Sequence, residues 1–432
     1  MSDRWGRDQV LGLAPDTAAV KAATTVAKPA KWARAGCDEQ AVWGECAGSG
    51  ASVYRTSADL AEPAFRCTCP SRKFPCKHAL GLLLLWSDGT IDPAARPAWV
   101  AEWLDARAER AGQAERSRER TAARAADPET AQRRERRVEE GLAELGRWLR
   151  DQVAQGLSGA ESASYQAWDD VARRLVDAQA GAVAGRVREL ASIPHGGGRA
   201  WPERLLAEYA LLHLLVRAYE RGDDLPPDLR ATVRSRVGFT VPQEEVLAGP
   251  RVRDHWYVAG SHDTEQDRLV TRRVWLRGRA TGRPALVLSF GAPGRPLEAS
   301  LPVGSLIDAD LAFYPGAQPL RALIAERHGP PHQGPPGGGR VLDLLDEYAA
   351  GLARDPWLDR WPALLAGVRP ARADGVPHVV DDRGDALPLL GPVPWRLLAM
   401  SGGRPCTVGG EWTPAGLRPL SAWREDEGVI LL

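Results

Sequence analysis

With 432 residues, the chain is too long for one ordinary domain, and we expect roughly two to four folded units. Hydrophobic residues make up 44% and charged residues 26%, and there are 16 tryptophans, a composition that excludes a disordered chain and a fibre. The 56 basic side chains are balanced by 56 acidic ones, so the net charge gives no case for a nucleic-acid-binding protein and any basic surface must be local.

The chain shows no sign of a membrane segment or of a secretory leader. The N-terminal stretch "MSDRWGRDQVLGLAPD" has no apolar run, and the run Ala79 to Trp86 is far shorter than the roughly 20 residues that cross a bilayer. Nearly all basic residues are arginine, which we attribute to the codon usage of a GC-rich genome. We therefore expect a cytoplasmic protein of bacterial type without membrane contact.

Residues 1–34 look like an N-terminal extension. Small and polar residues alternate there, and three of the five lysines of the chain fall in it. A short helix is expected from Pro15 to Ala27.

A cluster of cysteines follows in "FRCTCPSRKFPCKH", residues 65–78. Its spacing is Cys67-x-Cys69, six residues, then Cys76-x-His78. Three thiolates and one imidazole complete a tetrahedral set for zinc and leave no open position. Alternate residues of an extended "AFRCTC" project to one side, so both sulfurs can reach one ion. Cys76 precedes an apolar stretch that predicts a helix beginning near Lys77 or His78, and a helix N-terminus favours thiolate.

Other roles for these cysteines are a buried core thiol, a disulfide or a catalytic nucleophile. Few cysteines in so long a chain suit a metal in a reducing compartment better than a disulfide framework. A catalytic Cys-His dyad is disfavoured because the neighbouring thiols would compete for metal. We expect Cys37, Cys46 and Cys406 to be small buried residues that bind no metal.

Four basic residues surround the cluster, and two roles stay open for them. A zinc ion with three thiolates has a formal charge of minus one, which nearby cations can neutralise while they donate hydrogen bonds to sulfur. The same cations can contact phosphate or a partner protein. These residues are Arg66, Arg72, Lys73 and Lys77.

The motif Cys-x-Cys-x6-Cys-x-His followed by an apolar helix resembles the SWIM-type zinc finger. Upstream, Val42 to Leu60 looks like the strand, glycine turn and strand that precede the metal motif in that family. The resemblance implies that Cys67, Cys69, Cys76 and His78 bind one structural Zn2+ in a small ββα module, here residues 35–95. The family occurs in chromatin remodellers, plant transposases and bacterial proteins, where it is proposed to bind DNA or proteins.

Residues 96–150 form a charged helical connector. Arginine and glutamate alternate from Trp99 to Arg150, a pattern that favours a solvated helix interrupted at Pro128. A basic DNA-binding arm is the alternative, but acidic residues nearly balance the arginines.

A helical domain is expected over residues 151–237, and helical patterning is clearest over 201–221. His213 borders the apolar stripe of that segment, where we expect a histidine with satisfied hydrogen bonds inside a helix bundle. The stripe comprises Leu205, Leu206, Tyr209, Leu212, Val216 and Tyr219. The glycine run from Pro194 to Pro202 does not match a nucleotide-binding loop.

The pattern changes to strands over residues 238–327, where an antiparallel domain of four or five strands is expected. His255 and His262 lie beside Asp254 and Asp263, and we favour surface hairpin residues there over a metal site. The Pro/Gly linker at 328–340 should leave His328 and His332 solvated.

Residues 341–432 should form an α+β C-terminal region. It contains an amphipathic helix from Val341 to Ala353 and strands around "HVVDD", "WRLLAMSG" and "GVILL". The fold class is therefore α+β, with a small N-terminal ββα zinc-binding module, a helical middle region and a C-terminal antiparallel β-rich domain with helices.

No catalytic motif is found. The P-loop requires a lysine after glycine, and none of the five lysines follows a glycine, so a Walker A motif is excluded. His-Glu-x-x-His, Gly-x-Ser-x-Gly and the protein-kinase motifs are absent too. The acidic pairs Asp223/Asp224 and Asp381/Asp382 are expected in solvated turns. An unfamiliar active site within residues 240–432 stays as the alternative.

Three functions follow in order of preference. The first is a zinc-binding adaptor whose partner is a protein, with a separate ATPase as one candidate. The second is DNA binding through the basic residues around the zinc site. The third is an enzyme with an unrecognised C-terminal active site.

Overall fold

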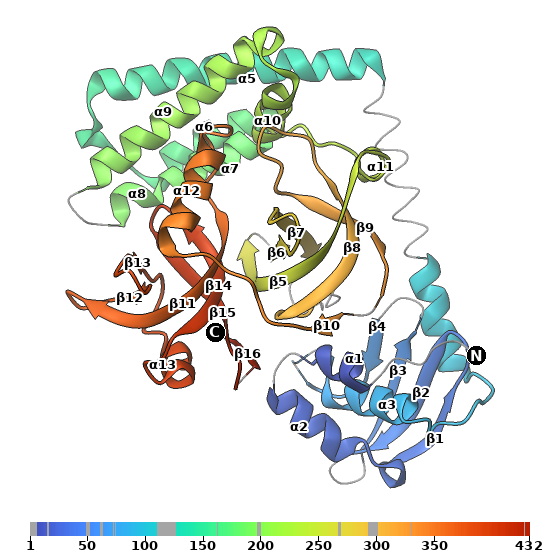
Figure 1. Cartoon of the computed structure of the whole chain (residues 1–432). Helices are drawn as coiled ribbons and strands as arrows, with labels where there is room; N and C mark the ends of the chain where they lie inside the picture. The colour runs from blue at the N-terminus through green and yellow to red at the C-terminus, as the bar shows by residue number, and fades with distance from the viewer. Residues whose placement is uncertain are drawn as a thin grey trace.

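The computed structural model describes residues 7–14, 17–48, 52–60, 64–71, 73, 75–109, 127–161, 163–196, 200–266, 269–292, 301–329, 331–426 and 428–432. Figure 1 shows a small N-terminal module, a layer of helices, and two curled antiparallel sheets that lie side by side beneath the helices. The expected α+β class, with strands first, helices in the middle and antiparallel sheets last, is confirmed.

The N-terminal module is a four-stranded antiparallel sheet with helices on one face. Its strands run in chain order: β1 (Trp32–Cys37), β2 (Ala41–Ala47), β3 (Val53–Asp59) and β4 (Ala64–Cys67). Helix α3 (Lys77–Ser87) packs on the sheet, and its buried residues run without a break from His78 to Trp86. A helix that is buried on every side must pack against other elements on every side.

Helices upstream and downstream provide that cover. Helix α2 (Thr17–Val26), close to the expected helix, packs on α3 so tightly that a Cβ on Gly81 would lie 2.7 Å from Val26. Helix α1 (Arg7–Gly12) and the 3-10 turn η1 (Pro29–Lys31) precede the sheet. A helical segment at residues 98–109 buries Val100 and Trp103 beside Trp43 on the other face. The module is thus larger than the expected ββα unit.

The middle region is a helix bundle whose first helix begins at Pro128, where an interruption was expected. The expected boundary between a connector at 96–150 and a helical domain at 151–237 was wrong, because this helix runs through it and buries Val138, Leu142 and Leu145 in the bundle. Asp127 caps helix α5 (Pro128–Gln155) by accepting a hydrogen bond from the Thr130 backbone N–H at 3.1 Å, and proline suits the first helical position. The remaining elements are η2 (Leu157–Ala160), α6 (Tyr165–Asp177), α7 (Gly181–Leu190), α8 (Ser192–His195), α9 (Trp201–Glu220), η3 (Gly222–Asp224) and α10 (Pro227–Val237).

Helix α9 confirms most of the expected apolar stripe and corrects two details. Leu205, Tyr209, Leu212 and Val216 are buried. The prediction for Leu206 was wrong, since it is 46% exposed because it faces away from the bundle. The expectation of a satisfied His213 was wrong as well, because its Nδ1 is buried without a hydrogen-bond partner in the described part of the chain.

The first curled sheet has six strands, one more than expected. The order is β10-β8-β5-β6-β7, with β9 also paired to β8. The backbone N–H of Leu286 on β7 donates to Leu320 O at 2.7 Å, which brings the far edge back toward β9. Trp256 fills the centre. After helix α11 (Gln243–Ala248) the strands are β5 (Arg251–Gln266), β6 (Leu269–Gly278), β7 (Pro284–Gly291), β8 (Ser305–Phe313), β9 (Ala322–Arg327) and β10 (His332–Gln333).

One prediction within this sheet was wrong. The segment 328–340 is not purely a linker, because His332–Gln333 pairs with β8. His328 and His332 are exposed residues, as expected, although the Nε2 of His328 lies 3.2 Å from Asp310 Oδ2. Within the expected strand region 238–327, residues 293–300 lie outside the described residues, and β8 begins at Ser305.

The second curled sheet has the order β13-β12-β11-β14-β15-β16. The segment "WRLLAMSG", expected to be a strand, is a helix, because Leu397 and Met400 are spaced by three residues and both face the core. Helix α12 and the strands at "HVVDD" and "GVILL" are as expected. The elements are α12 (Val341–Leu352), β11 (Trp361–Ala373), β12 (Val376–Val380), β13 (Ala386–Pro388), α13 (Trp395–Ser401), β14 (Cys406–Thr413), β15 (Gly416–Arg424) and β16 (Gly428–Leu431).

The acidic pair Asp381/Asp382 departs from the expectation of a solvated turn. Asp381 is buried and accepts backbone hydrogen bonds from Val341 at 3.2 Å, Arg383 at 2.9 Å and Asp385 at 3.0 Å. These hydrogen bonds lower the pKa of Asp381 against the effect of burial, which raises it. The carboxylate therefore joins the start of α12 to the turn after β12.

The two sheets pack face to face around one buried carboxylate. Glu411 on β14 is 1% exposed, and it accepts hydrogen bonds from Trp275 Nε1 at 3.1 Å and from Arg360 at 2.9 Å. Ser421 Oγ donates to Ala259 O at 2.5 Å across the same interface. Because a buried charge needs such partners, these contacts fix how the sheets face each other.

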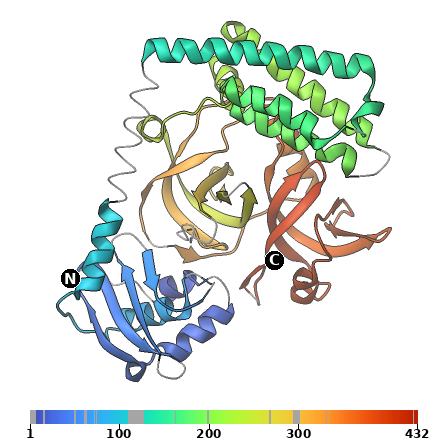
Figure 2. The ribbon, with the colours of Figure 1, turned by 180° about the vertical axis from the view of Figure 1, so that it is seen from behind.

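The helix bundle is joined to the second sheet by polar contacts. Arg236 on α10 pairs with the buried Asp355 at 2.7 Å. Trp357 Nε1 donates to Leu211 O on α9 at 2.9 Å. Figure 2 shows, from behind, the helices lying across both sheets.

Close approach of the sheets makes Gly409 a sensitive position. A Cβ there would lie 2.3 Å from Ala259 O and 2.6 Å from Ser421 Oγ. We predict that Gly409→Ala destabilises the protein by about 1–3 kcal/mol, as overpacking does. Gly185→Ala in α7 is the matched control, because nothing lies within 4 Å of its Cβ and alanine favours a helix by roughly 0.5–1 kcal/mol over glycine. Calorimetric unfolding of both variants checks this, and equal transition temperatures would contradict it.

Candidate metal centre

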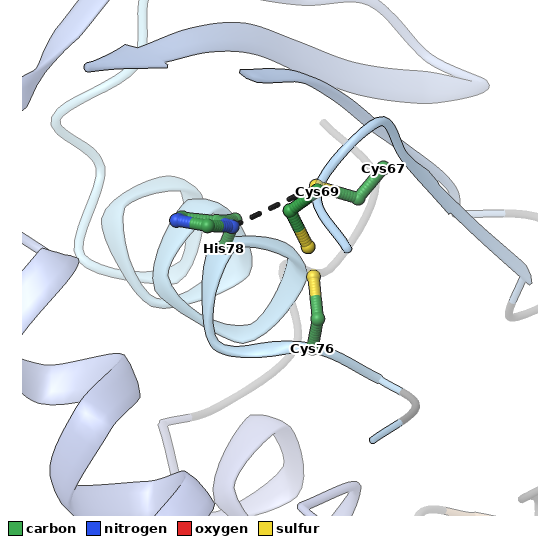
Figure 3. A group of neighbouring side chains, drawn as sticks. All are labelled: Cys67, Cys69, Cys76 and His78. Atoms are coloured by element: carbon green, nitrogen blue, oxygen red, sulfur yellow. Dashed lines mark hydrogen bonds between the residues drawn. The ribbon is translucent and has the colours of Figure 1, made fainter. Parts of the chain in front are cut away.

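The four predicted ligands meet where the end of the sheet faces the start of α3. Cys67 is the last residue of β4, Cys69 lies two residues further, Cys76 is the N-cap of α3 and His78 lies in its first turn. Figure 3 shows the four side chains converging. Their sulfur and ring nitrogen atoms all lie within 4.8 Å of one another. In a tetrahedral centre with Zn–S distances of about 2.3 Å, sulfurs are about 3.8 Å apart, so the arrangement fits zinc.

Local structure explains why the ligands converge. β4 pairs with β3 so that Cys67 lies opposite Thr56, and Thr56 Oγ1 is 3.2 Å from Cys67 Sγ. Burial of α3 fixes Cys76 and His78 at its first turn. His78 is 3% exposed, and its Nδ1 lies 3.7 Å from Cys67 Sγ, so Nδ1 is the nitrogen that faces the sulfurs.

Contacts among the thiols shift their pKa values in opposite directions. Hydrogen bonds from Cys76, then from His78 and Thr56, lower the pKa of Cys67. The hydrogen bond with Cys67, together with burial, raises the pKa of Cys76, and burial raises that of Cys69. The Cys67 thiolate is thus stabilised by the Cys76 thiol, the His78 imidazole and the Thr56 hydroxyl. Because zinc binds thiolates, metal binding must release the remaining protons, and zinc affinity should fall as pH falls.

Comparison with family models agrees with this geometry. A model of the SWIM zinc finger matches residues 66–86, and a model of the SWIM-associated four-helix bundle domain matches residues 133–237. The chain therefore contains a SWIM zinc finger and a SWIM-associated four-helix bundle domain. No curated protein matches the chain, and no solved structure matches it. Among the described residues, no helix is both long and apolar enough to cross a bilayer.

The SWIM finger contains contacts that the sequence did not predict. The ring of Tyr54 on β3 lies 5.0 Å from that of His78, and Thr56 contacts Cys67 as described. Both residues lie on β3, so they hold ligands that come from β4 and α3. The only sequence signal is their alternation along the strand, which does not reveal the register with β4.

The basic residues around the SWIM finger are distributed on its surface. The side chains of Arg66, Lys73 and Lys77 are exposed, while Arg72 lies outside the described residues. Their role as counter-charges or as contacts for a partner stays a prediction.

The remaining cysteines are buried, as expected, and none belongs to a metal-ligand group of the described residues. Cys37 and Cys46 lie in the SWIM module, where each Sγ contacts a backbone carbonyl at 3.6 Å. Burial raises the pKa of Cys406 to about 11, which makes its thiol a poor nucleophile at neutral pH.

The residues around His255 and His262 do not form one site. Asp254 is buried and accepts hydrogen bonds from the backbone N–H groups of Ala280 at 3.0 Å and Thr281 at 2.8 Å. Asp263 pairs with Arg272 at 2.8 Å. His262 is half-buried, and its pKa is lowered by burial first and then by Arg418. Asp254 therefore stabilises a turn, whereas Asp263 forms an ion pair on the strand.

Replacement of one ligand tests the zinc assignment. We predict that Cys69→Ser protein, purified alongside the unmodified chain, loses the zinc that the latter retains, because the closed site loses one of its thiolates. Cys406→Ser removes a buried cysteine far from the cluster and should keep its zinc. Metal content by mass spectrometry is the measurement, and stoichiometric zinc in the Cys69→Ser protein would contradict the assignment.

Proposed function

We propose that this protein is an adaptor in which one structural zinc ion holds the N-terminal module and exposed residues bind a partner protein. The observation that carries the proposal is the closed ligand set. Four protein ligands fill a tetrahedral ion, so no position is left for substrate or activated water. A closed centre stabilises a surface and performs no chemistry.

The structural role of zinc is supported by what the ligands connect. Cys67 and Cys69 end the sheet, while Cys76 and His78 begin α3. The ion would therefore join the two parts of the module across the segment 70–75. Small sites of this kind are rarely formed without their metal.

Removal of zinc tests that role. We predict that chelation, or Cys69→Ser, increases backbone hydrogen exchange across residues 35–90 because the sheet and α3 lose their link. Exchange in the helix bundle and both C-terminal sheets should stay unchanged, which makes these regions an internal control. Unchanged protection of α3 in the zinc-free protein would show that zinc has no structural role.

Charge distribution favours a protein over nucleic acid as the partner. Arginines of the bundle are paired with carboxylates, as in Arg174 with Glu144 at 2.7 Å, Arg186 with Glu208 at 2.8 Å and Arg188 with Asp169 at 2.9 Å. Paired arginines add little to a basic DNA-binding stripe. With a net charge of zero, the chain has no long-range attraction for a polyanion.

Exposed apolar residues beside the second sheet also favour a protein as the partner. Trp395 at the start of α13 is 73% exposed, and Leu398, one turn later, and the preceding Val393 are exposed too. Tryptophan is enriched in protein interfaces, whereas charged residues are depleted in their centres. A separate ATPase is the class of partner that we favour, since the chain lacks a Walker A lysine of its own.

We also propose that the chain is not an enzyme. A depression of about 520 Å³ lies on the second sheet, between Arg404, Trp423 and Asp426. Its buried cation Arg424 already pairs with Asp426 and donates to Met400 O at 2.6 Å, and the raised pKa of Cys406 opposes a nucleophilic role. The other carboxylate of the depression, Glu425, is exposed, and the lining residues include no evident catalytic pair.

Capture of the partner tests the adaptor function. The tagged chain should retain a protein from its native cell extract that the Cys69→Ser chain does not, and the purified pair should bind with a Kd that zinc chelation weakens at least tenfold. The Cys406→Ser chain is the control and should bind as the unmodified chain does. Equal binding by the Cys69→Ser chain would contradict a role for the finger.

DNA binding is the second candidate, favoured by the exposed Arg66, Lys73 and Lys77 beside the zinc centre. If it operates, DNA affinity should fall steeply with salt, and the double change Arg66→Gln with Lys77→Gln should reduce the slope of log K against log salt by roughly two. Arg369→Gln with Arg372→Gln, on exposed positions of β11, is the matched control. Absence of DNA binding at low salt would remove this candidate.

A further inference from the structure

Polar side chains of three neighbouring strands lie in rows on the outer face of the first curled sheet. Ala309 and Leu311 on β8 are buried, so the alternate residues Asp308 and Asp310 face outward. Strand pairing sets Arg253 of β5 and Glu326 of β9 on either side of Asp310. The next row holds His255 opposite Asp308, and the backbone N–H of His328 donates to Asp308 O at 2.9 Å.

An irregularity in the β8–β9 pairing brings three of these side chains together. The register shifts between Asp310 and Leu311, which pair with Glu326 and Ile324 and leave Ala325 as an extra residue. Bulges of this kind re-aim side chains and occur often beside functional sites. As a result, ligand atoms of Asp310, Glu326 and His328 all lie within 4.8 Å of one another.

Charge makes this arrangement costly unless a cation is present. Asp310 and Glu326 are direct cross-strand partners, and like charges in that position destabilise a sheet. The nearest candidate, Arg253, points instead to Asp308, with its Nε 3.2 Å and its Nη2 3.1 Å from the two carboxylate oxygens. That pairing leaves the carboxylate of Asp310 to other cations.

Arg251 is a weakly placed cation. Arg251 lies 3.8 Å from Glu326, with both side chains about half exposed, and such pairs contribute little. Within the described part of the chain, Asp310 has its ion-pair contact with His328 at 3.2 Å, and these two side chains are only 16% and 21% exposed. The Asp310 carboxylate and the His328 imidazole are therefore held in place beside the Glu326 carboxylate.

We propose that Asp310, Glu326 and His328 form a second metal site, which binds a divalent first-row transition ion such as Mn2+ or Zn2+. Two carboxylates neutralise a divalent cation, and the mixture of carboxylate and imidazole ligands suits these ions. Three protein ligands leave positions for water, in contrast to the closed zinc centre. The inference does not depend on the adaptor function.

The donor sets of the two sites allow them to be separated. Mn2+ prefers oxygen and imidazole ligands, whereas the thiolates of the finger favour zinc. We therefore titrate the full chain, loaded with one equivalent of zinc to fill the finger alone, with MnCl2 and follow free Mn2+ by electron paramagnetic resonance. The expected result is one bound Mn2+ per chain, also in the Cys69→Ser protein, because residues of the finger take no part.

Single substitutions decide whether the three residues bind the ion. His328→Ala and Glu326→Gln should each weaken Mn2+ binding at least tenfold. His378→Ala, a half-buried strand histidine of the second sheet, and Glu265→Gln, an exposed glutamate near the end of β5, are the matched controls and should leave binding unchanged. Unfolding temperatures of all variants establish that they fold, which is expected because Glu326 faces solvent and the substituted groups lie outside the core.

Three results would overturn the proposal. One is no bound Mn2+ and no second Zn2+ at millimolar metal. Another is Mn2+ affinity that is equal in the His328→Ala protein and the unmodified chain, or that falls as much in the control variants. The third is loss of Mn2+ binding in the Cys69→Ser protein, which would assign the ion to the finger.

Discussion

Burial of α3 is the constraint on which the N-terminal module depends. Nine consecutive buried residues cannot be covered by one sheet face, so α2, which precedes the sheet in the chain, must pack on the helix as well. The same burial fixes the first turn, where Cys76 and His78 meet the cysteines of β4. Hydrophobic packing positions half of the ligand set, and strand pairing positions the other half.

A different constraint organises the C-terminal half. Two curled sheets pack closely enough that Gly409 has no room for a Cβ, and the buried Glu411 must find its partners on both sides of the interface. A carboxylate in such a place specifies one relative orientation, because any other would leave it without hydrogen bonds. The hydrogen bonds of Glu411 thus help to determine how the two sheets are oriented relative to each other.

Much of this molecule could be predicted from local pattern. The zinc ligands follow from residue type and spacing, and the helices α3, α9 and α12 follow from apolar runs or periodicity. Predictions were wrong where long-range contacts decide the outcome. The helix α13 was assigned as a strand because seven residues are too short to reveal a period, and the core contacts of Leu397 select the helix.

Register is the information that the sequence does not carry. Thr56 contacts Cys67 because β3 and β4 pair with one particular alignment, and Glu326 lies opposite Asp310 because β9 has one extra residue. The contact between His328 and Asp310 was not predictable for the same reason, since it depends on pairing across the sheet. Asp381 was assigned to a solvated turn because its hydrogen bond from the Val341 backbone N–H forms only when α12 docks.

The contacts between the helix bundle and the second sheet have a mechanical consequence. Asp355 is buried and paired with Arg236, and Trp357 reaches the backbone of α9, so the bundle cannot tilt without exposing or breaking a buried ion pair. Glu411 in turn joins the second sheet to the first. Because these contacts would have to break before the parts could separate, we expect the bundle and the two sheets to move together as one block.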